Sequence, residues 1–472
     1  MKRSSSVLRY GGFAFSVGGA RVAGILISSL TFPYLVRHLG VEMYGLWSYV
    51  VALCAFLNIV ADPGLTSYAS QQVAAQREGG IDLVPDVIAL RVLFSAIAAI
   101  VLLAVASFEV RSDIRHLLRL YGVGLLIVNL LTGDAFLTAL EMFHIRSLLV
   151  ISQQAIYALG IFAFVHTPKD VIWLPISILG SSVVSGLVGW CILWGHGFRP
   201  PRIVRPRRWK RIVVPSGHYA LSTLMSNLYH RSGHIVVRWF LGDHALGLYA
   251  AAVRLLDLLR SFVIIVLQVL NPRMALFAKS EAGLNRVTRF AVVVIALVSL
   301  PLTAGLISTA HLVVPLVLGP HFLEDVSLMK IMAFFLITAS AASLTTGSIL
   351  YSMGRHRAYL ASTAGGAAAG VILYLTLIPT MGLAGAGLAF VLAEFVVAAI
   401  GYALLPPALH NLWKDPIVGV ALASSLLMAV AVRIVSAYVP QVFVVVATGV
   451  FVYVGSCGWF VRKWFIEQFA AP

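Results

Sequence analysis

Apolar residues recur along the whole chain in long runs, separated by short polar or charged segments. Many runs exceed about 18 residues, the length at which an apolar helix can cross a hydrocarbon core of about 30 Å. We therefore expect an all-α polytopic membrane protein with about fourteen transmembrane helices. The predicted spans are residues 11–36, 44–61, 84–108, 118–140, 147–165, 171–195, 215–240, 245–270, 287–310, 326–352, 358–379, 383–406, 417–435 and 442–464.

Composition supports this class, since 60% of the residues are hydrophobic, 11% are charged and the mean hydropathy is +0.94. The formal net charge is +16, which in a soluble protein would suggest a nucleic-acid partner. Most of this surplus lies between the apolar runs, where Lys and Arg hold cytoplasmic loops in place. We therefore expect contact with membrane lipids and no nucleic acid. The three cysteines fall inside apolar runs without ligand spacing, so neither a disulfide nor a metal site is expected.

The distribution of basic residues predicts the orientation in the membrane. With the N-terminus inside, 21 of the 34 Lys and Arg residues fall on the cytoplasmic side, eight on the outer side and five within spans. This bias follows the positive-inside rule, and an even number of spans places both termini in the cytoplasm.

The chain contains an internal echo of the form LGxxxxGL, at residues 39–46 and again at residues 241–248. The two copies follow the first and the seventh predicted span, so they predict two parallel six-helix repeats. Chance is the alternative, because Gly and Leu are abundant. The predicted organisation is an N-lobe at 1–198, a basic cytoplasmic linker at 199–211, a C-lobe at 212–406, and the last two helices with the C-terminus at 407–472.

Polar residues recur every three or four positions along the seventh predicted span and would share one helix face. They are Thr223, Asn227, His230, Arg231, His234 and Arg238. Such a cationic face suits an anionic cargo, and Arg231 is the strongest candidate because it lies near the middle of the span. The alternative for Arg231 is a structural ion pair with Asp62 or Asp134. His230 and His234 have metal-binding spacing without a third ligand, so lining of a wet cavity is the preferred interpretation.

Further ionisable residues are predicted inside the membrane, where each is a functional candidate. The remaining cations are Arg21, Arg91, Arg254 and Arg260, and the acids are Asp62, Asp134, Asp257 and Glu394. We expect the cations to bind substrate and the acids to form coupling or structural ion pairs. For Arg21 and Arg91 the alternative is snorkelling to the headgroups. Arg254, Asp257 and Arg260 share a helix face, so they could equally form a self-neutralised cluster.

Enzymatic motifs are missing from the sequence. No loop is long enough for a soluble domain, and no DxD, HExxH, GxSxG or Walker motif occurs. The sequence therefore favours a transporter without a cofactor, and leaves coupling to H⁺ or Na⁺ open.

Four segments resemble signatures of the polysaccharide (Wzx-type) flippases in the MOP/MATE-like exporter superfamily. They are residues 33–46 (PYLVRHLGVEMYGL), 62–65 (DPGL), 240–252 (FLGDHALGLYAAA) and 382–389 (GLAGAGLA). Many members carry an acid in the seventh helix where this chain has Gly233 and His234, so the coupling ion does not transfer from the resemblance.

The resemblance implies a flippase in the bacterial cytoplasmic (inner) membrane. It would move an undecaprenyl-diphosphate-linked oligosaccharide to the outer leaflet by alternating access, for exopolysaccharide, O-antigen or capsule biosynthesis. A polysaccharide polymerase or the export machinery would be its protein partner. The alternatives are a lipid II flippase or a multidrug/cation antiporter of the same superfamily, and, less favoured, a membrane polysaccharide polymerase or ligase.

Overall fold

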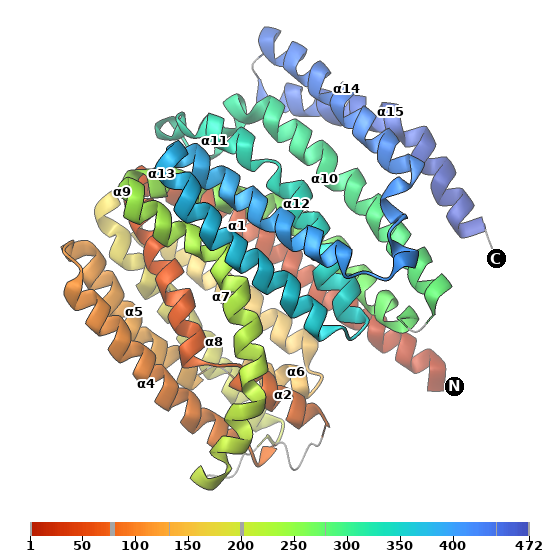
Figure 1. Ribbon diagram of the computed structural model, residues 1–472. Helices are drawn as coiled ribbons and strands as arrows, with labels where there is room; N and C mark the ends of the chain where they lie inside the picture. Colours follow the sequence, from red (N-terminus) through yellow and green to blue (C-terminus); the bar gives the residue numbers. More distant parts are fainter. Residues whose placement is uncertain are drawn as a thin grey trace. The chain divides into compact units, whose positions relative to one another are not determined.

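A computed structural model describes residues 2–75, 81–131, 133–198, 203–278, 280–439 and 441–470. Within these ranges the chain is built from helices and contains no strand, which confirms the predicted all-α class (Figure 1). The chain forms two compact units, residues 1–227 and 228–472. The predicted lobe and linker boundaries stay a prediction.

Among its described residues, the first unit contains seven α-helices and the start of an eighth. They are α1 (Lys2–Ala61), α2 (Leu65–Ala75), α4 (Val84–Phe108), α5 (Ser112–Leu131), α6 (Asp134–Ala139), α7 (Phe143–Phe164), α8 (Trp173–Gly195) and the beginning of α9 (Trp209–Phe277). Short 3-10 segments at Pro168–Ile172 and Pro206–Arg208 precede α8 and α9.

The second unit contains the rest of α9 and the helices that follow it. They are α10 (Glu281–Val317), α11 (Asp325–Met332), α12 (Phe335–Ala342), α13 (His356–Ala403), α14 (Pro416–Tyr438) and α15 (Val442–Ala470). A π-helical segment at Ser343–Leu350 continues α12, and short 3-10 segments lie at Pro320–Phe322, Pro407–Leu409 and Leu412–Lys414.

Three of the longest helices are broken by a glycine in a left-handed backbone conformation. Gly40 in α1 has φ 70° and ψ 177°, Gly242 in α9 has φ 85° and ψ −176°, and Gly382 in α13 has φ 61° and ψ −135°. Gly40 and Gly242 occupy the same place in the two LGxxxxGL copies. The two sequence copies therefore share the same backbone break, which supports an internal repeat.

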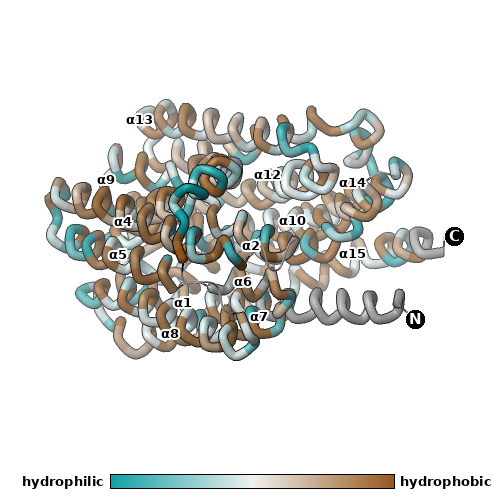
Figure 2. The backbone as a smooth tube through the Cα atoms, turned by 90° about the horizontal axis from the view of Figure 1, so that it is seen from below, coloured by the Kyte–Doolittle hydropathy of each residue, from teal (hydrophilic) through white to brown (hydrophobic). Residues whose placement is uncertain are grey.

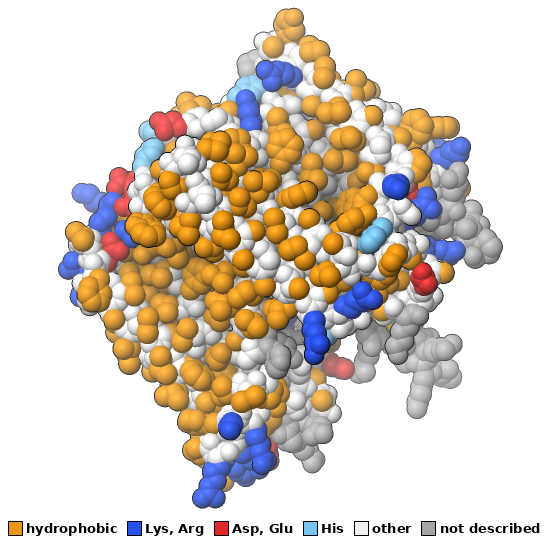
Figure 3. Space-filling model, in the orientation of Figure 1, with side chains coloured by type: hydrophobic (Ala, Val, Ile, Leu, Met, Phe, Trp, Pro, Cys, Tyr) orange, Lys and Arg blue, Asp and Glu red, His pale blue; other side chains and the backbone are white. Residues whose placement is uncertain are grey.

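Ten helical segments among the described residues are long and apolar enough to cross a membrane. Figure 2 shows apolar residues along the helices, and the face drawn in Figure 3 is covered mainly by hydrophobic side chains. Large apolar side chains such as Leu30 (70% exposed) and Phe451 (80% exposed) lie on the surface, as expected for helices that face lipid. The chain is a multi-pass membrane protein. The number fourteen stays a prediction.

The fourth predicted span is wrong at both ends. Residues 118–140 were expected to form one helix, whereas α5 covers Ser112–Leu131 and Asp134 begins the separate helix α6. Gly133 packs against the indole of Trp190, where an added Cβ would lie 3.1 Å from the ring. Hydropathy could not detect this break because apolar residues continue on both sides of it.

Packing in the first unit holds the end of the basic linker in place. Its main core cluster includes Phe136, Trp190, Phe198 and Ile212. The buried carboxylate of Asp86 accepts hydrogen bonds from the backbone N–H of Arg205 at 2.6 Å and from the Trp209 indole at 3.3 Å. Because backbone and indole donors converge on it, the chain enters α9 from a fixed position.

In the second unit, polar contacts attach the last two helices, α14 and α15, to α10. The Tyr453 hydroxyl of α15 donates to the carbonyl oxygen of Leu297 at 3.0 Å. At the start of α14, Asp415 pairs with Arg289 of α10 at 2.5 Å and also caps its own helix through the N–H of Ile417. Polar contacts of this kind persist in lipid, where apolar surfaces gain little from burying each other.

Candidate functional site

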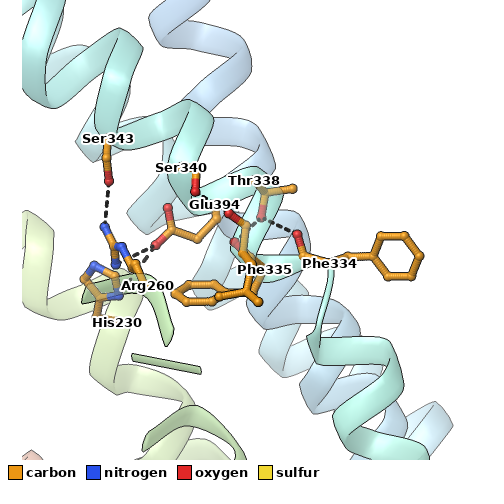
Figure 4. Close-up of polar contacts among 9 residues, drawn as sticks. His230, Arg260, Phe334, Phe335, Thr338, Ser340, Ser343 and Glu394 are labelled. Carbon is orange, nitrogen blue, oxygen red and sulfur yellow. Dashed lines mark hydrogen bonds and ion pairs between the residues drawn. The ribbon is translucent and has the colours of Figure 1, made fainter. Parts of the chain in front are cut away.

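A charged interior site of the second unit is centred on Glu394, in the second arm of α13. Its Oε1 atom lies 3.6 Å from Nδ1 of His230 and 3.8 Å from Nη1 of Arg260 (Figure 4). His230 precedes the break at Gly242 and Arg260 follows it. One carboxylate therefore connects both arms of α9 with α13.

Arg260 has two further contacts on neighbouring segments. Its Nη2 donates to the Ser343 hydroxyl at 3.0 Å, and its guanidinium carbon lies 5.5 Å from the centre of the Phe335 ring (Figure 4). Phe335 itself stacks on Phe390 at 4.4 Å. Ser343 opens the π-helical segment, a type of helix that is rare and often found at functional sites.

A second interior cluster of this unit is made of hydroxyl groups. Tyr249 of α9 and Tyr374 of α13 are fully buried and join their hydroxyls at 2.9 Å. The ring of His234 lies edge-on to Tyr249, with 5.4 Å between centroids. Gly233 makes room for the pair, since a Cβ there would lie 2.8 Å from Tyr374 and closer still to the Tyr249 hydroxyl. The tyrosine pair therefore excludes an acid at position 233 in this arrangement.

The other candidates of the second unit lie at various depths. Arg231 and Asp257 are half-buried, and Arg254 is exposed. Arg260 contacts Glu394, Ser343 and Phe335 on other segments, and it also lies near Asp257 on its own helix. Arg238, a residue of the predicted cationic face, is half-buried and pairs with Asp243 at 2.8 Å across the break at Gly242.

In the first unit, Arg91 is a buried residue with two identified partners. Its Nε lies 3.6 Å from Asp62 and its Nη2 donates to Asn129 at 3.3 Å. Asp62 also accepts from the backbone N–H of Thr66 at 3.2 Å and from the Thr66 hydroxyl, so it caps α2. Arg91 is therefore buried in an ion pair and does not snorkel to the headgroups, and its part in substrate binding stays a prediction.

The remaining sequence candidates are more peripheral. Arg21 is exposed, and Asn227 is half-buried with its amide donating to the carbonyl of Thr223 at 3.0 Å. The side chain of Asp134 lies outside the described residues. The roles assigned to all these residues stay predictions.

Sequence reasoning missed four members of the interior clusters: Phe335, Ser343, Tyr249 and Tyr374. None carries a charge, so none stood out against the surrounding apolar residues. The serine and threonine residues at 343, 345 and 346 were the only available signal, because hydroxyls inside a spanning segment often hydrogen-bond to a neighbouring helix.

Chemically, the cluster around Glu394 can hold an anion or exchange a proton. Arginine offers paired donors and stays charged, while a carboxylate and an imidazole can each gain or lose a proton. Among the described residues no group of three or more His, Cys, Asp or Glu could hold a metal ion.

The candidate membrane-spanning helices and the charged interior cluster are typical of a polytopic transporter. Residues 14–278, more than half of the chain, match the family described as "Polysaccharide biosynthesis protein". The chain belongs to this family.

Known relatives agree with this assignment. The Escherichia coli (strain K12) protein named "Putative O-antigen transporter" is 25% identical over 319 residues, which cover 65% of this chain and 75% of the relative. The lipid II flippase MurJ in an inward closed conformation has a similar structure, with a TM-score of 0.76 and 14% identity, covering 96% of this chain and 99% of that one.

A transporter of the MOP superfamily from Pyrococcus furiosus has a TM-score of 0.59 and 16% identity, covering 87% of this chain and 96% of that one. At these identities the structural comparisons establish the fold alone. The family match confirms the predicted polysaccharide family, and these structures confirm a fold like that of MurJ and MOP-superfamily transporters.

Proposed function

We propose that this protein is a flippase that moves an undecaprenyl-diphosphate-linked oligosaccharide from the cytoplasmic to the outer leaflet of the bacterial inner membrane. The glycan would enter O-antigen, capsule or exopolysaccharide synthesis, and an adjacent polymerase or export machinery would consume it. Membership of the polysaccharide biosynthesis family, the relative named as an O-antigen transporter and the transporter fold all support this proposal.

The observation that carries the proposal is a pair of arginines on the two arms of α9. Arg231 is half-buried, and the side chain of Arg260 is only 15% exposed. A cation inside a membrane protein is costly and is usually retained for function. Guanidinium groups bind phosphate oxygens through paired, charge-assisted hydrogen bonds, so a diphosphate is the chemical group that best suits them.

Two other cargoes remain alternatives within the same fold. A lipid II flippase is supported by the similarity to MurJ and would use the same diphosphate chemistry. A multidrug antiporter for cationic drugs is disfavoured, because Arg231 and Arg260 would repel a cation.

The proposal is tested by flipping in vesicles. Purified protein is reconstituted with a fluorescent undecaprenyl-diphosphate oligosaccharide, and dithionite quenches the outer-leaflet fluorophore. We expect Arg231→Ala to slow flipping at least tenfold and Arg231→Lys to retain part of the rate, because Lys keeps the charge but loses the paired donors. Arg286→Ala changes an exposed arginine of α10 and serves as the matched control.

Complementation then separates the candidate cargoes. Strains lacking their O-antigen flippase or depleted of their lipid II flippase each receive the wild-type gene. Restored surface polysaccharide supports the proposal, whereas rescue of the lipid II strain alone would assign the chain to peptidoglycan synthesis. Wild-type rates for both Arg231 variants would remove this arginine from the mechanism.

A further inference from the structure

Glu394 lies beside a histidine and an arginine but accepts no hydrogen bond from the part of the chain that the structure describes. Its side chain is 1% exposed, and its Oε1 lies 3.6 Å from His230 and 3.8 Å from Arg260. Neither carboxylate oxygen accepts a hydrogen bond from any described residue. A buried carboxylate in a static ion pair normally has such bonds, because they offset the cost of leaving water. The geometry indicates that the Glu394 carboxylate is not fixed by hydrogen bonds to either neighbour and can exchange its partner.

Arg260, in contrast, is held independently of Glu394. The Ser343 hydroxyl accepts a hydrogen bond from Nη2 of Arg260 at 3.0 Å. The guanidinium carbon lies 5.5 Å from the centre of the Phe335 ring. Its position would therefore survive the loss of the carboxylate. Its Nε has no hydrogen-bond partner among the described residues, so the guanidinium has capacity for another acceptor.

We propose that the anionic cargo displaces Glu394 as the counter-ion of Arg260, and that Glu394 takes up one proton from solvent in the same step. This inference rests on the proposed function, and it specifies how the site is coupled to protons. The diphosphate oxygens accept the guanidinium protons in hydrogen bonds. One O–H bond forms on the Glu394 carboxylate as a hydronium ion of the solvent loses a proton and becomes water, and no covalent bond of the cargo breaks.

The driving force is the cost of an unpaired charge. Once Arg260 turns to a phosphate, Glu394 would be a buried carboxylate beside a second anion, and protonation removes that penalty. His230 provides the route, since its side chain is 28% exposed and its Nδ1 points to Glu394 (Figure 4). An imidazole in this position can pass a proton between solvent and the buried acid.

The groups that face Glu394 define what else could titrate with it. From α9 they are His230, Arg260 and Asp257, and from the first arm of α13 Tyr374. The π-helical segment and α12 present the uncharged Ser343 and Phe335 to the cluster. Helix α11 carries Asp325 and Lys330 but packs on α13 at Gly387, about two turns from Glu394. Glu394, His230 and Asp257 therefore need separate variants.

The test measures proton uptake when a diphosphate binds to the purified full-length protein in detergent. The probe is farnesyl diphosphate, titrated calorimetrically in two buffers of different ionisation enthalpy between pH 7.5 and 8.5, above the range where phosphate groups change charge. We expect uptake of close to one proton, and an affinity that weakens about tenfold for each unit of rising pH, as proton linkage requires.

Variants assign the proton. Glu394→Gln should bind with little pH dependence and without this uptake, because a neutral side chain leaves Arg260 free for the phosphate. Asp257→Asn is the matched control, a second carboxylate near Arg260, and should keep the wild-type uptake. His230→Gln should also keep the uptake at equilibrium while slowing it in stopped flow with a pH indicator. Arg260→Ala should weaken binding at least tenfold.

The possible failures are distinguishable. Binding by the wild type without proton uptake, or uptake unchanged in Glu394→Gln, would overturn this inference and leave the flippase proposal standing. No binding of farnesyl diphosphate by the wild type would overturn both. The uptake count of the wild type decides the matter even where a variant fails to fold.

Discussion

At the scale of single residues, Gly233 is a position where a methyl group cannot fit. A Cβ there would lie 2.8 Å from Tyr374 and closer to the Tyr249 hydroxyl. We expect Gly233→Ala to lower the free energy of unfolding by about 1–3 kcal/mol, as overpacking does elsewhere, measured as the melting temperature of the purified protein. Gly217→Ala, in the same helix with open space around it, should leave stability unchanged or slightly raised.

The clash also predicts a rescue. Adding Tyr249→Phe to Gly233→Ala removes the hydroxyl that a Cβ would meet first and should restore part of the lost stability. A double variant that is less stable than the sum of the two single changes would show that steric overlap is not the cause.

Asp62 forms an ion pair with the buried guanidinium of Arg91. Removing the carboxylate abolishes the ion pair between Asp62 and the buried Arg91, at an expected cost of about 3–5 kcal/mol. Asp62→Asn keeps the cap on α2 and should cost less than Asp62→Ala, because Asn caps helices as well as Asp. The melting temperatures of both variants test this order, and Arg91→Met should rescue Asp62→Asn. Equal losses for Asn and Ala would mean that the cap contributes nothing.

At the scale of elements, the glycines that break α1 and α9 should be irreplaceable. Gly40 and Gly242 combine φ of 70° and 85° with ψ near 180°, a region open essentially to glycine alone. We expect Gly40→Ala and Gly242→Ala each to cost about 1–3 kcal/mol of stability and to reduce the yield of folded protein. Gly419→Ala in α14, which has no neighbouring atom within 4 Å, is the control. If Gly40→Ala and Gly242→Ala both left stability and yield unchanged, the helix breaks would not require glycine.

The sequence predicted helix boundaries well where a change in hydropathy sets them, and poorly where tertiary packing sets them. The span 84–108 coincides with α4, because a polar segment bounds it on each side. The end of α5 depends on Gly133 meeting Trp190, 57 positions away, and no local pattern encodes that contact. The same holds for the site: Arg260 and Glu394 were identified as charges in apolar runs, but their pairing, and the part of Ser343, needed the tertiary structure.

At the scale of the whole molecule, the two breakpoint glycines relate the sequence to the membrane topology. Each is the second residue of a copy of LGxxxxGL, and each is followed by an acid that pairs with arginine: Glu42 with Arg111, and Asp243 with Arg238. If the two copies descend from one repeat of six helices, both LGxxxxGL segments must face the same side of the membrane. Six crossings separate them, and an even number of crossings returns the chain to its starting side.

This orientation yields a prediction for the intact protein in cells. In a background where Cys54, Cys191 and Cys457 are replaced, single cysteines are placed at Val110, His244, Arg207 and Arg357, all exposed positions. A membrane-impermeant maleimide should label the first two in intact spheroplasts, and the last two only after permeabilisation, because the basic segments stay in the cytoplasm. Labelling of Val110 and His244 from opposite sides would exclude parallel repeats, and labelling of all four from outside would contradict cytoplasmic placement of the linker.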